Sequence, residues 1–154
     1  MKCLVAYFSA GGKTAEFAKA LAEMASADLF EIRPENPYSA ADLRWTNPIA
    51  RCNREKIGKK DVPVLGTVEN WNQYDTVCLG FPIWYYAAPN VVNSFCNGYS
   101  WAGKRLVLFA TSGGSEIGKT AEKLQPYLKG NPEIISACVY KNPDDLIAAV
   151  RDLL

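Results

Sequence analysis

Residues 3–14, which read CLVAYFSAGGKT, decide the fold of this chain. The first six form an unbroken apolar run, which is typical of a strand covered on both faces of a parallel sheet. A loop containing glycine begins at Ser9, and after it Phe17, Leu21 and Met24 recur at helical spacing. A buried strand, a glycine-containing loop and a helix in this order predict the first unit of an α/β domain.

Four further stretches of four to six mainly apolar residues follow along the chain and are expected to form strands. They occupy residues 29–32, 76–81, 106–110 and 134–139. Helix signals stand between and after them: Pro89 before an apolar helical pattern, a helix expected to end near Leu128 with Pro126 as its candidate stop signal, and Asn142-Pro143 before the last segment. Strands that alternate with helices require right-handed crossovers and a parallel sheet. We therefore expect a doubly wound α/β fold, with a five-stranded parallel sheet in three α/β/α layers, and a single domain of residues 1–154.

The stretch between residues 34 and 74 is longer than an ordinary connection. Such stretches usually contain structure of their own or serve function. We expect one helix in it, between Ala40 and Glu55. Arg51, Cys52 and Arg54 also fall in this stretch, and we interpret them as surface residues.

The composition excludes several classes of function. The chain has 154 residues with 17 basic and 16 acidic side chains, a net charge of +1, so it lacks the basic surface of a nucleic-acid-binding protein and has no polybasic run for a membrane. The five cysteines form no C-x-x-C pair and histidine is absent, so no disulfide framework and no metal site are expected. The apolar run near the N-terminus is too short for a signal peptide or a membrane span. We expect a cytoplasmic protein, a monomer or weak dimer.

Three loops are the candidates for a binding site. In doubly wound sheets, ligands bind beyond the carboxyl ends of the strands, where the strand order reverses. This rule selects the loops after the first, third and fourth strands. The predicted site residues are Ser9, Ala10, Gly11, Gly12, Lys13 and Thr14 in the first loop, Pro82, Ile83, Trp84, Tyr85 and Tyr86 in the second, and Thr111, Ser112, Gly113 and Gly114 in the third.

The first loop has the chemistry of an anion cradle. It leads into a helix N-terminus, whose N–H groups have no partner within the helix, and its glycines allow the backbone to approach an anion closely. Ser9 and Thr14 add hydroxyl donors. A nucleotide-binding P-loop is excluded because Tyr7 stands where that motif requires its first glycine. The alternative interpretation is a plain glycine turn with a helix cap.

The second and third loops differ in character. Trp84, Tyr85 and Tyr86 stand together where small polar turn residues are usual, and a flat aromatic ligand that stacks on them would explain the cluster. A hydrophobic lid or a partner surface remains the alternative. The third loop offers backbone N–H groups and hydroxyls, which suit the polar edge of a heteroaromatic ring. An anion cradle, an aromatic surface and a polar edge together describe a mononucleotide with a large flat ring.

Here the sequence resembles the flavodoxins, in particular their short-chain relatives. The similar stretches are residues 5–14, 74–85 and 109–115, with a weaker likeness at 37–45. The resemblance covers essentially the whole chain. It implies a flavin mononucleotide (FMN), with its phosphate held by the first loop and its isoalloxazine ring between the second and third loops.

The chain departs from the flavodoxin pattern at three points. Gly11 replaces a usual Ser or Thr, so one hydroxyl contact to the phosphate is missing and we expect backbone N–H groups to replace it in part. The third loop lacks the tyrosine that often stacks on the ring. The net charge of +1 differs from the acidic surface of most flavodoxins.

The resemblance implies an electron carrier between two redox partner proteins, a reductase and an acceptor. The alternative is an NAD(P)H-dependent quinone or FMN reductase on the same fold, which the open third loop and the neutral charge favour. A flavin-free interaction module is a third possibility. We assign no catalytic side chain from the sequence.

Overall fold

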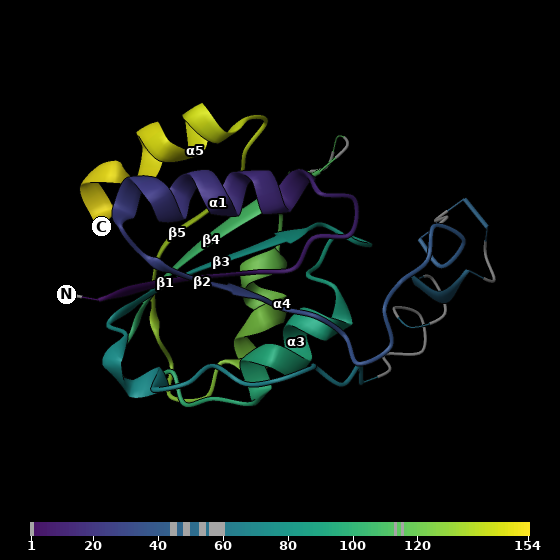
Figure 1. The fold of residues 1–154 in the computed structure, drawn as a ribbon, viewed down its shortest axis with the longest axis horizontal. Helices are drawn as coiled ribbons and strands as arrows, with labels where there is room; N and C mark the ends of the chain where they lie inside the picture. Colours follow the sequence, from purple (N-terminus) through teal and green to yellow (C-terminus); the bar gives the residue numbers. More distant parts are fainter. Residues whose placement is uncertain are drawn as a thin grey trace.

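The computed structural model describes residues 2–43, 46–47, 50–52, 55, 61–112, 114 and 116–154. In this part of the chain, five parallel strands form one sheet in the order β2-β1-β3-β4-β5 (Figure 1). The strands are β1 Cys3–Tyr7, β2 Asp28–Glu31, β3 Thr76–Pro82, β4 Arg105–Thr111 and β5 Glu133–Val139. Because β2 lies on one side of β1 and all later strands lie on the other, the order reverses between β1 and β3.

Helices cover both faces of the sheet, which confirms the predicted doubly wound fold. Helices α1 (Lys13–Ala25) and α5 (Pro143–Val150) lie on one face, while α3 (Asn90–Asn97) and α4 (Thr120–Leu124) lie on the other (Figure 1). Successive strand side chains point to opposite faces. In β1, Val5 packs in the α1 and α5 layer, whereas Leu4 and Ala6 pack in the α3 layer.

Gly80 in β3 shows how tightly this sheet is packed. A Cβ atom added there would lie 2.2 Å from Phe109 Cζ, because Gly80 and Phe109 are partners in neighbouring strands. The missing side chain of Gly80 therefore provides the space in which the Phe109 ring packs.

Two of the expected helix boundaries are confirmed and one is wrong. Asn142 caps α5 by accepting a hydrogen bond from the Asp145 N–H at 2.9 Å, and α3 begins directly after Pro89. The helix expected to reach Leu128 ends at Leu124, and a 3-10 turn, Gln125–Tyr127, follows it. Pro126 lies in this turn, and its ring and missing N–H are poorly tolerated inside an α-helix.

Two short segments at the base of the stretch between residues 34 and 74 run antiparallel beside each other. Pro34 and Val64 form an antiparallel bridge, and the Leu65 N–H donates to the Arg33 carbonyl at 2.7 Å. Arg51, Cys52 and Glu55 are helical, in agreement with the helix expected between residues 40 and 55. Residues 44–45, 48–49 and 53–54 of that expected helix lie outside the described residues.

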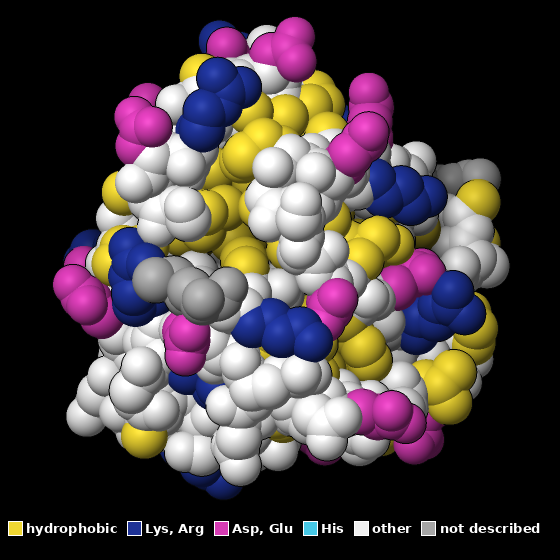
Figure 2. Space-filling view, turned by 60° about the vertical axis from the view of Figure 1, so that its left-hand side comes forward, with side chains coloured by type: hydrophobic (Ala, Val, Ile, Leu, Met, Phe, Trp, Pro, Cys, Tyr) yellow, Lys and Arg dark blue, Asp and Glu magenta, His cyan; other side chains and the backbone are white. Residues whose placement is uncertain are grey.

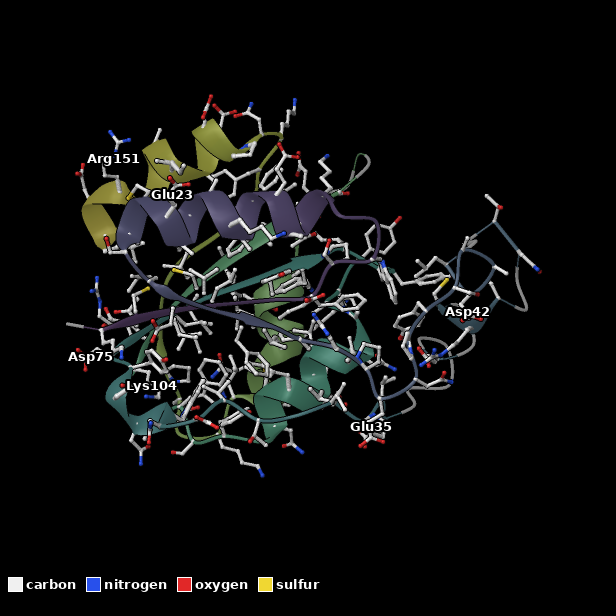
Figure 3. The ribbon with its side chains drawn as sticks, in the orientation of Figure 1. Glu23, Glu35, Asp42, Asp75, Lys104 and Arg151 are labelled. Atoms are coloured by element: carbon white, nitrogen blue, oxygen red, sulfur yellow. The ribbon has the colours of Figure 1, made fainter. Side chains whose placement is uncertain are left out.

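The first part of this stretch projects beyond the carboxyl ends of the strands, and its last residues return to the opposite end of the sheet (Figure 1). Figure 3 places Glu35 and Asp42 at that end of the molecule, and Asp75 and Lys104 at the opposite end. Among the described residues, no helix has the length and apolar character needed to cross a membrane.

Candidate functional site

The first loop has the backbone geometry of an anion site. Gly12 is the N-cap of α1 with φ of 93°, in the left-handed region, and its N–H donates to Ser9 Oγ at 3.0 Å. No side chain caps α1, so its first N–H groups lack the partners that later helical residues have. A Cβ atom added at Gly11 or Gly12 would meet nothing within 4 Å. The loop is therefore open to a ligand, and its exposed donors fit a phosphate group.

Thr14 joins the first loop to the third. Its side chain is buried, and its Oγ1 lies 2.7 Å from Thr111 Oγ1 at the end of β4. Sequence reasoning placed the Thr14 hydroxyl on the phosphate. The structure gives it a protein partner, although one bond between two hydroxyls uses only one of their two hydrogens.

The second loop is a tight turn in an uncommon conformation. Trp84 and Ala87 exchange two backbone hydrogen bonds, of 2.9 and 3.1 Å, across Tyr85 and Tyr86. These two tyrosines have φ of 51° and 61°, a region that bulky L-residues rarely adopt and that costs free energy. Helix α4 holds the turn, because Lys123 Nζ donates to the Tyr86 carbonyl at 3.3 Å. The turn presents both tyrosine side chains to solvent, 49% and 72% exposed.

Trp84 belongs to a cluster of three rings that we call the aromatic wall: Phe8, Tyr38 and Trp84. The Trp84 ring meets Phe8 edge-on at a centroid distance of 5.7 Å and Tyr38 at 5.5 Å, and Phe8 and Tyr38 are 5.9 Å apart. Trp84 is half-buried, so part of the indole is available to a ligand. Sequence reasoning selected Trp84 but neither of its two ring partners.

The third loop lies beside the second. The Ile83 N–H donates to the Thr111 carbonyl at 2.9 Å, and Pro82 and Thr111 are register partners of β3 and β4. Ser112 is half-buried, and Gly114 is exposed with open space around it. Gly113 lies outside the described residues. No aromatic ring projects from the described residues of this loop, as the sequence predicts.

A charged network behind the aromatic wall was missed by sequence reasoning. Arg51 Nε donates to Glu55 Oε2 at 2.8 Å, the Arg51 guanidinium lies 4.1 Å from the Tyr38 ring centroid, and the Tyr38 hydroxyl donates to Glu55 Oε1. Arg51 also donates to the carbonyls of Asn36 and Pro37, at 2.6 and 3.2 Å. One guanidinium therefore holds both the backbone and the ring of this part of the wall.

The interpretation of Arg51 and Cys52 as surface residues is wrong. The Arg51 and Glu55 side chains are each only 13% exposed, and Cys52 is buried. Arg54 lies outside the described residues. The spacing of Arg51 and Glu55, i and i+4, is a detectable helical ion-pair signal, but nothing in the sequence connects that pair to Tyr38.

Tyr38 does not serve as an acid near neutral pH. Burial raises the pKa of its hydroxyl strongly, and the hydrogen bond to Glu55 raises that pKa further. The hydroxyl therefore remains protonated, and its proton is already donated to Glu55. Tyr38 contributes a ring surface and a fixed position to the site.

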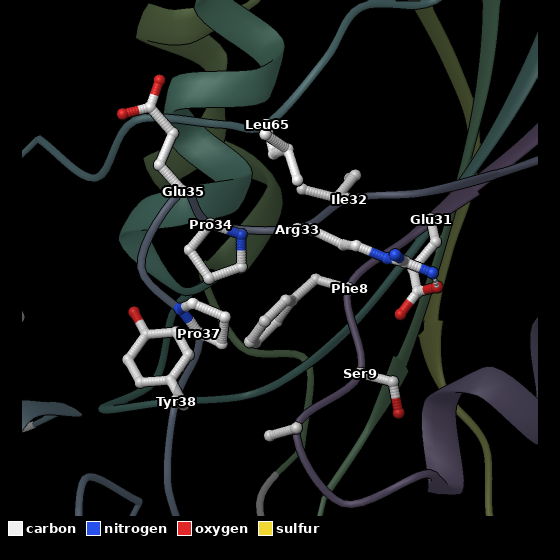
Figure 4. A pocket seen from close by; sticks show the side chains of 11 residues that line it. Phe8, Ser9, Glu31, Ile32, Arg33, Pro34, Glu35, Pro37, Tyr38 and Leu65 are labelled. Atoms are coloured by element: carbon white, nitrogen blue, oxygen red, sulfur yellow. Dashed lines mark hydrogen bonds and ion pairs between the residues drawn. The ribbon is translucent and has the colours of Figure 1, made fainter.

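A cavity of about 290 Å³ adjoins the first loop on the β2 side (Figure 4). Ser9 and Ala10 line it together with residues 31–35, which follow or end β2, and Phe8, Tyr38 and Leu65. Only Ser9 and Ala10 among these belong to the predicted site.

The fold and these loops define a doubly wound protein with an anion cradle beside an aromatic binding surface, as expected for a mononucleotide-binding domain. The sequence pattern of the flavodoxin family matches residues 2–137. A putative flavoprotein from Bacteroides eggerthii DSM 20697 is 38% identical, with a TM-score of 0.85 over 98% of this chain and 96% of that chain. A putative flavoprotein from Bacteroides uniformis ATCC 8492 is 34% identical, with a TM-score of 0.84 over 97% of each chain.

The chain therefore belongs to the flavodoxin family. A flavoprotein from Lactobacillus acidophilus NCFM, solved in complex with FMN, shares the fold at 21% identity, with a TM-score of 0.72 over 96% of each chain. FMN, the cofactor predicted from the sequence, is thus confirmed at the level of the family. A comparison with curated proteins gives no significant match.

Proposed function

We propose that this chain holds one FMN non-covalently and carries electrons between redox proteins. The phosphate would bind to residues 9–14, and the isoalloxazine ring would lie between the second and third loops. The observation that supports this assignment is the position of Thr111, which contacts both other loops. Its hydroxyl bonds Thr14 of the first loop, and its carbonyl accepts from Ile83 of the second. Three loops separated in sequence therefore meet at one edge of the sheet.

The phosphate would be held mainly by hydrogen bonds. The dipole of a helix is worth about 0.3–1 kcal/mol to an anion, whereas each hydrogen bond to a charged group contributes roughly 1.5–3 kcal/mol. The backbone donors beside Gly12 and the Ser9 hydroxyl are the groups in position to provide them. FMN should therefore bind more tightly than riboflavin, which has the ring but lacks the phosphate.

An electron carrier passes electrons through its flavin and does not depend on an acidic or basic side chain beside the ring. Bound FMN would supply the electron-accepting chemistry. The protein has no histidine, and the Tyr38 hydroxyl keeps its proton to high pH. These features support a carrier. Its redox partner proteins and its cytoplasmic location belong to the same proposal.

One observation favours the second candidate, an NAD(P)H-dependent quinone or FMN reductase. Ser112 and Gly114 leave the third loop without a ring that could cover the flavin. The charge balance supports this alternative too, because 17 basic and 16 acidic side chains provide no strong net charge to steer a carrier to its partner. Figure 2, which brings the end with the strand N-termini forward, shows both signs mixed on that side of the molecule.

Flavin binding is tested by reconstituting the purified protein with excess FMN and separating it by gel filtration. We expect a yellow protein with about one FMN per chain, and weaker retention of riboflavin. Protein that leaves the column without flavin would overturn the proposal.

The two candidate functions differ in their kinetics. A carrier should be reduced slowly by NADH or NADPH alone and should exchange electrons quickly with a flavodoxin-reductase-type protein. Turnover of a quinone with NAD(P)H at ordinary enzyme rates, about 1–10³ s⁻¹, would establish the reductase instead.

A further inference from the structure

The turn after β3 is held in a conformation that its residues do not favour. Trp84 and Ala87 form its two hydrogen bonds, and the two central residues, Tyr85 and Tyr86, both have positive φ. Turns of this kind favour asparagine and glycine at the central positions, because those residues adopt positive φ at little cost. The tyrosine side chains are largely exposed, so burial recovers little of this cost. Contacts from outside the turn must therefore stabilise it.

Two contacts fix the residues that flank the turn. On one side, the Ile83 N–H donates to the Thr111 carbonyl at the end of β4. On the other side, Pro89 is the N-cap of α3. Both contacts act next to the turn, and neither reaches its two central residues.

Helix α4 provides the contact at the centre of the turn. Lys123 Nζ lies 3.3 Å from the Tyr86 carbonyl oxygen, and Thr120 Oγ1 lies 3.5 Å from the same oxygen. The Thr120 hydroxyl has a single hydrogen, and the Ile117 carbonyl, which is nearer, accepts it. Among the described residues, Lys123 is therefore the side chain that donates to Tyr86.

The Lys123 ammonium group is not shared with a carboxylate. None of the ion pairs between described residues involves Lys123. A hydrogen bond with a charged donor is stronger than one between neutral groups, although the exposure of Lys123 to water weakens it. The contact is thus strong enough to bias the conformation of an exposed turn, with effects of several-fold rather than of many orders of magnitude.

We propose that Lys123 is a positioning residue for the flavin ring. By holding the Tyr86 carbonyl, it keeps the turn at residues 84–87 in the conformation that receives the ring, without touching the flavin itself. The proposal rests on the FMN binding proposed above. Without Lys123 the strained turn would leave this conformation more often, and the ring would have to reorder it on binding. FMN and riboflavin should then be weakened by the same factor, because both contain the ring.

The first test uses the apoprotein and does not depend on flavin. The Trp84 and Ala87 N–H groups form the hydrogen bonds across the turn, so their hydrogen exchange reports how often it opens. Lys123→Met removes the donor and its charge but keeps a long apolar side chain. Both amides should exchange several-fold faster in this variant. Lys123→Arg, which can donate to the same carbonyl, should restore the wild-type rates.

The second test measures flavin affinity. Lys123→Met should weaken FMN and riboflavin equally, by about three- to ten-fold, and Lys123→Arg should bind both nearly as tightly as the wild type. Lys119→Met is the matched control, because it removes the same charge from the residue before α4, whose side chain makes no described hydrogen bond to the turn. It should leave both affinities unchanged. An equal loss in Lys119→Met would mean that charge, rather than the contact with Tyr86, is what matters, and would overturn the proposal.

A double-mutant cycle tests whether Lys123 acts through the strain of the turn. Tyr86→Asn lowers that strain, because asparagine adopts positive φ more readily than tyrosine. In the Tyr86→Asn background, Lys123→Met should therefore weaken riboflavin by a smaller factor than in the wild type. The same factor in both backgrounds would show that Lys123 does not act by holding a strained turn.

The results for the wild type and for Lys123→Met separate this proposal from the function on which it rests. Wild-type protein that retains no flavin would overturn both. Wild-type protein that binds FMN, with Lys123→Met equal to it in flavin affinity and in amide exchange, would overturn the positioning role alone. Thermal denaturation of each variant should show an intact fold, because Lys119 and Lys123 are exposed.

Discussion

The first loop and the aromatic wall are two halves of one site, and they are built in different ways. The first loop is local: the Ser9 side chain, the Gly12 N–H and one left-handed backbone conformation create it within a few residues. The aromatic wall collects Phe8, Tyr38 and Trp84 from distant parts of the chain. The position of the Tyr38 ring in this wall depends on the Arg51 guanidinium, which is itself almost buried.

This difference determines how each half can be damaged. Backbone donors cannot be deleted by a side-chain substitution, so the first loop is vulnerable mainly through its conformation. The aromatic wall is vulnerable through single side chains, because each ring and the Arg51 charge are supported by contacts that no neighbour in sequence can replace. Four substitutions test this distinction, from the largest expected effect to the smallest.

Arg51→Ala should have the largest effect on stability. It leaves Glu55 without its cation and two backbone carbonyls without a donor. Removing one partner of a fully buried ion pair costs about 3–5 kcal/mol, and because Arg51 and Glu55 retain some exposure we expect about 2–3 kcal/mol. Urea denaturation of the apoprotein measures this loss in the free energy of unfolding.

Arg51→Ala should leave the ratio of FMN to riboflavin affinity unchanged, since the first loop does not depend on Arg51. Arg151→Ala, an exposed arginine at the opposite end of the molecule (Figure 3), is the control and should change stability by less than about 0.5 kcal/mol. An Arg51→Ala protein as stable as the wild type would show that the three rings of the aromatic wall keep their positions without the Arg51 guanidinium.

Trp84→Ala should mainly weaken flavin binding. Stacking of a flat base on an aromatic side chain is worth about 1–3 kcal/mol, and FMN and riboflavin should lose equal amounts because both contain the ring. Titration of the apoprotein measures both affinities, and FMN should quench part of the tryptophan fluorescence in the wild type but less in the variant.

Trp101→Ala is the comparison for Trp84. Trp101 is fully buried and donates to the Cys96 carbonyl, so its removal should cost about 3–5 kcal/mol of stability without a direct effect on the ring. If Trp84→Ala shows that pattern instead, with unchanged FMN affinity, Trp84 is a core residue and Tyr86 becomes the candidate for stacking.

Gly12→Ala should damage the first loop through its backbone alone. The φ of 93° costs an L-residue about 1–2 kcal/mol, while an added Cβ meets no atom. FMN affinity should fall more than riboflavin affinity. Gly11→Ala has the same open space without a positive φ, and it should be nearly neutral; equal effects of the two substitutions would mean that the conformation of Gly12 is unimportant.

Thr14→Ala should have the smallest effect and should separate two roles of one hydroxyl. Losing the bond to Thr111 costs about 0.5–1.5 kcal/mol of stability, and Thr111→Ala should cost a similar amount. The double variant should be less destabilised than the sum, because both single changes remove the same bond. If the Thr14 hydroxyl also reaches the phosphate, only Thr14→Ala will weaken FMN relative to riboflavin.

Much of the fold is predictable from the sequence because its signals are local. The apolar run at residues 3–8, Pro89 before α3 and the Asn142 cap of α5 each act within a few residues. The end predicted for α4, near Leu128, is wrong because it too was read from a local signal. A proline signals a break, but the sequence alone does not say where the last full α-helical turn ends.

The chain by itself determined the loop at residues 9–14, because a glycine-containing turn at a helix start presents free N–H groups whatever surrounds it. It also determined that aromatic residues follow β3. Only the tertiary structure decided that Thr111 connects all three loops, that Tyr38 and Phe8 complete the aromatic wall around Trp84, and that Arg51 lies behind it with little exposure. The physical reason is that these contacts join segments far apart in the chain, and their geometry exists only after the strands have paired in register and the stretch between residues 34 and 74 has packed against the strand ends.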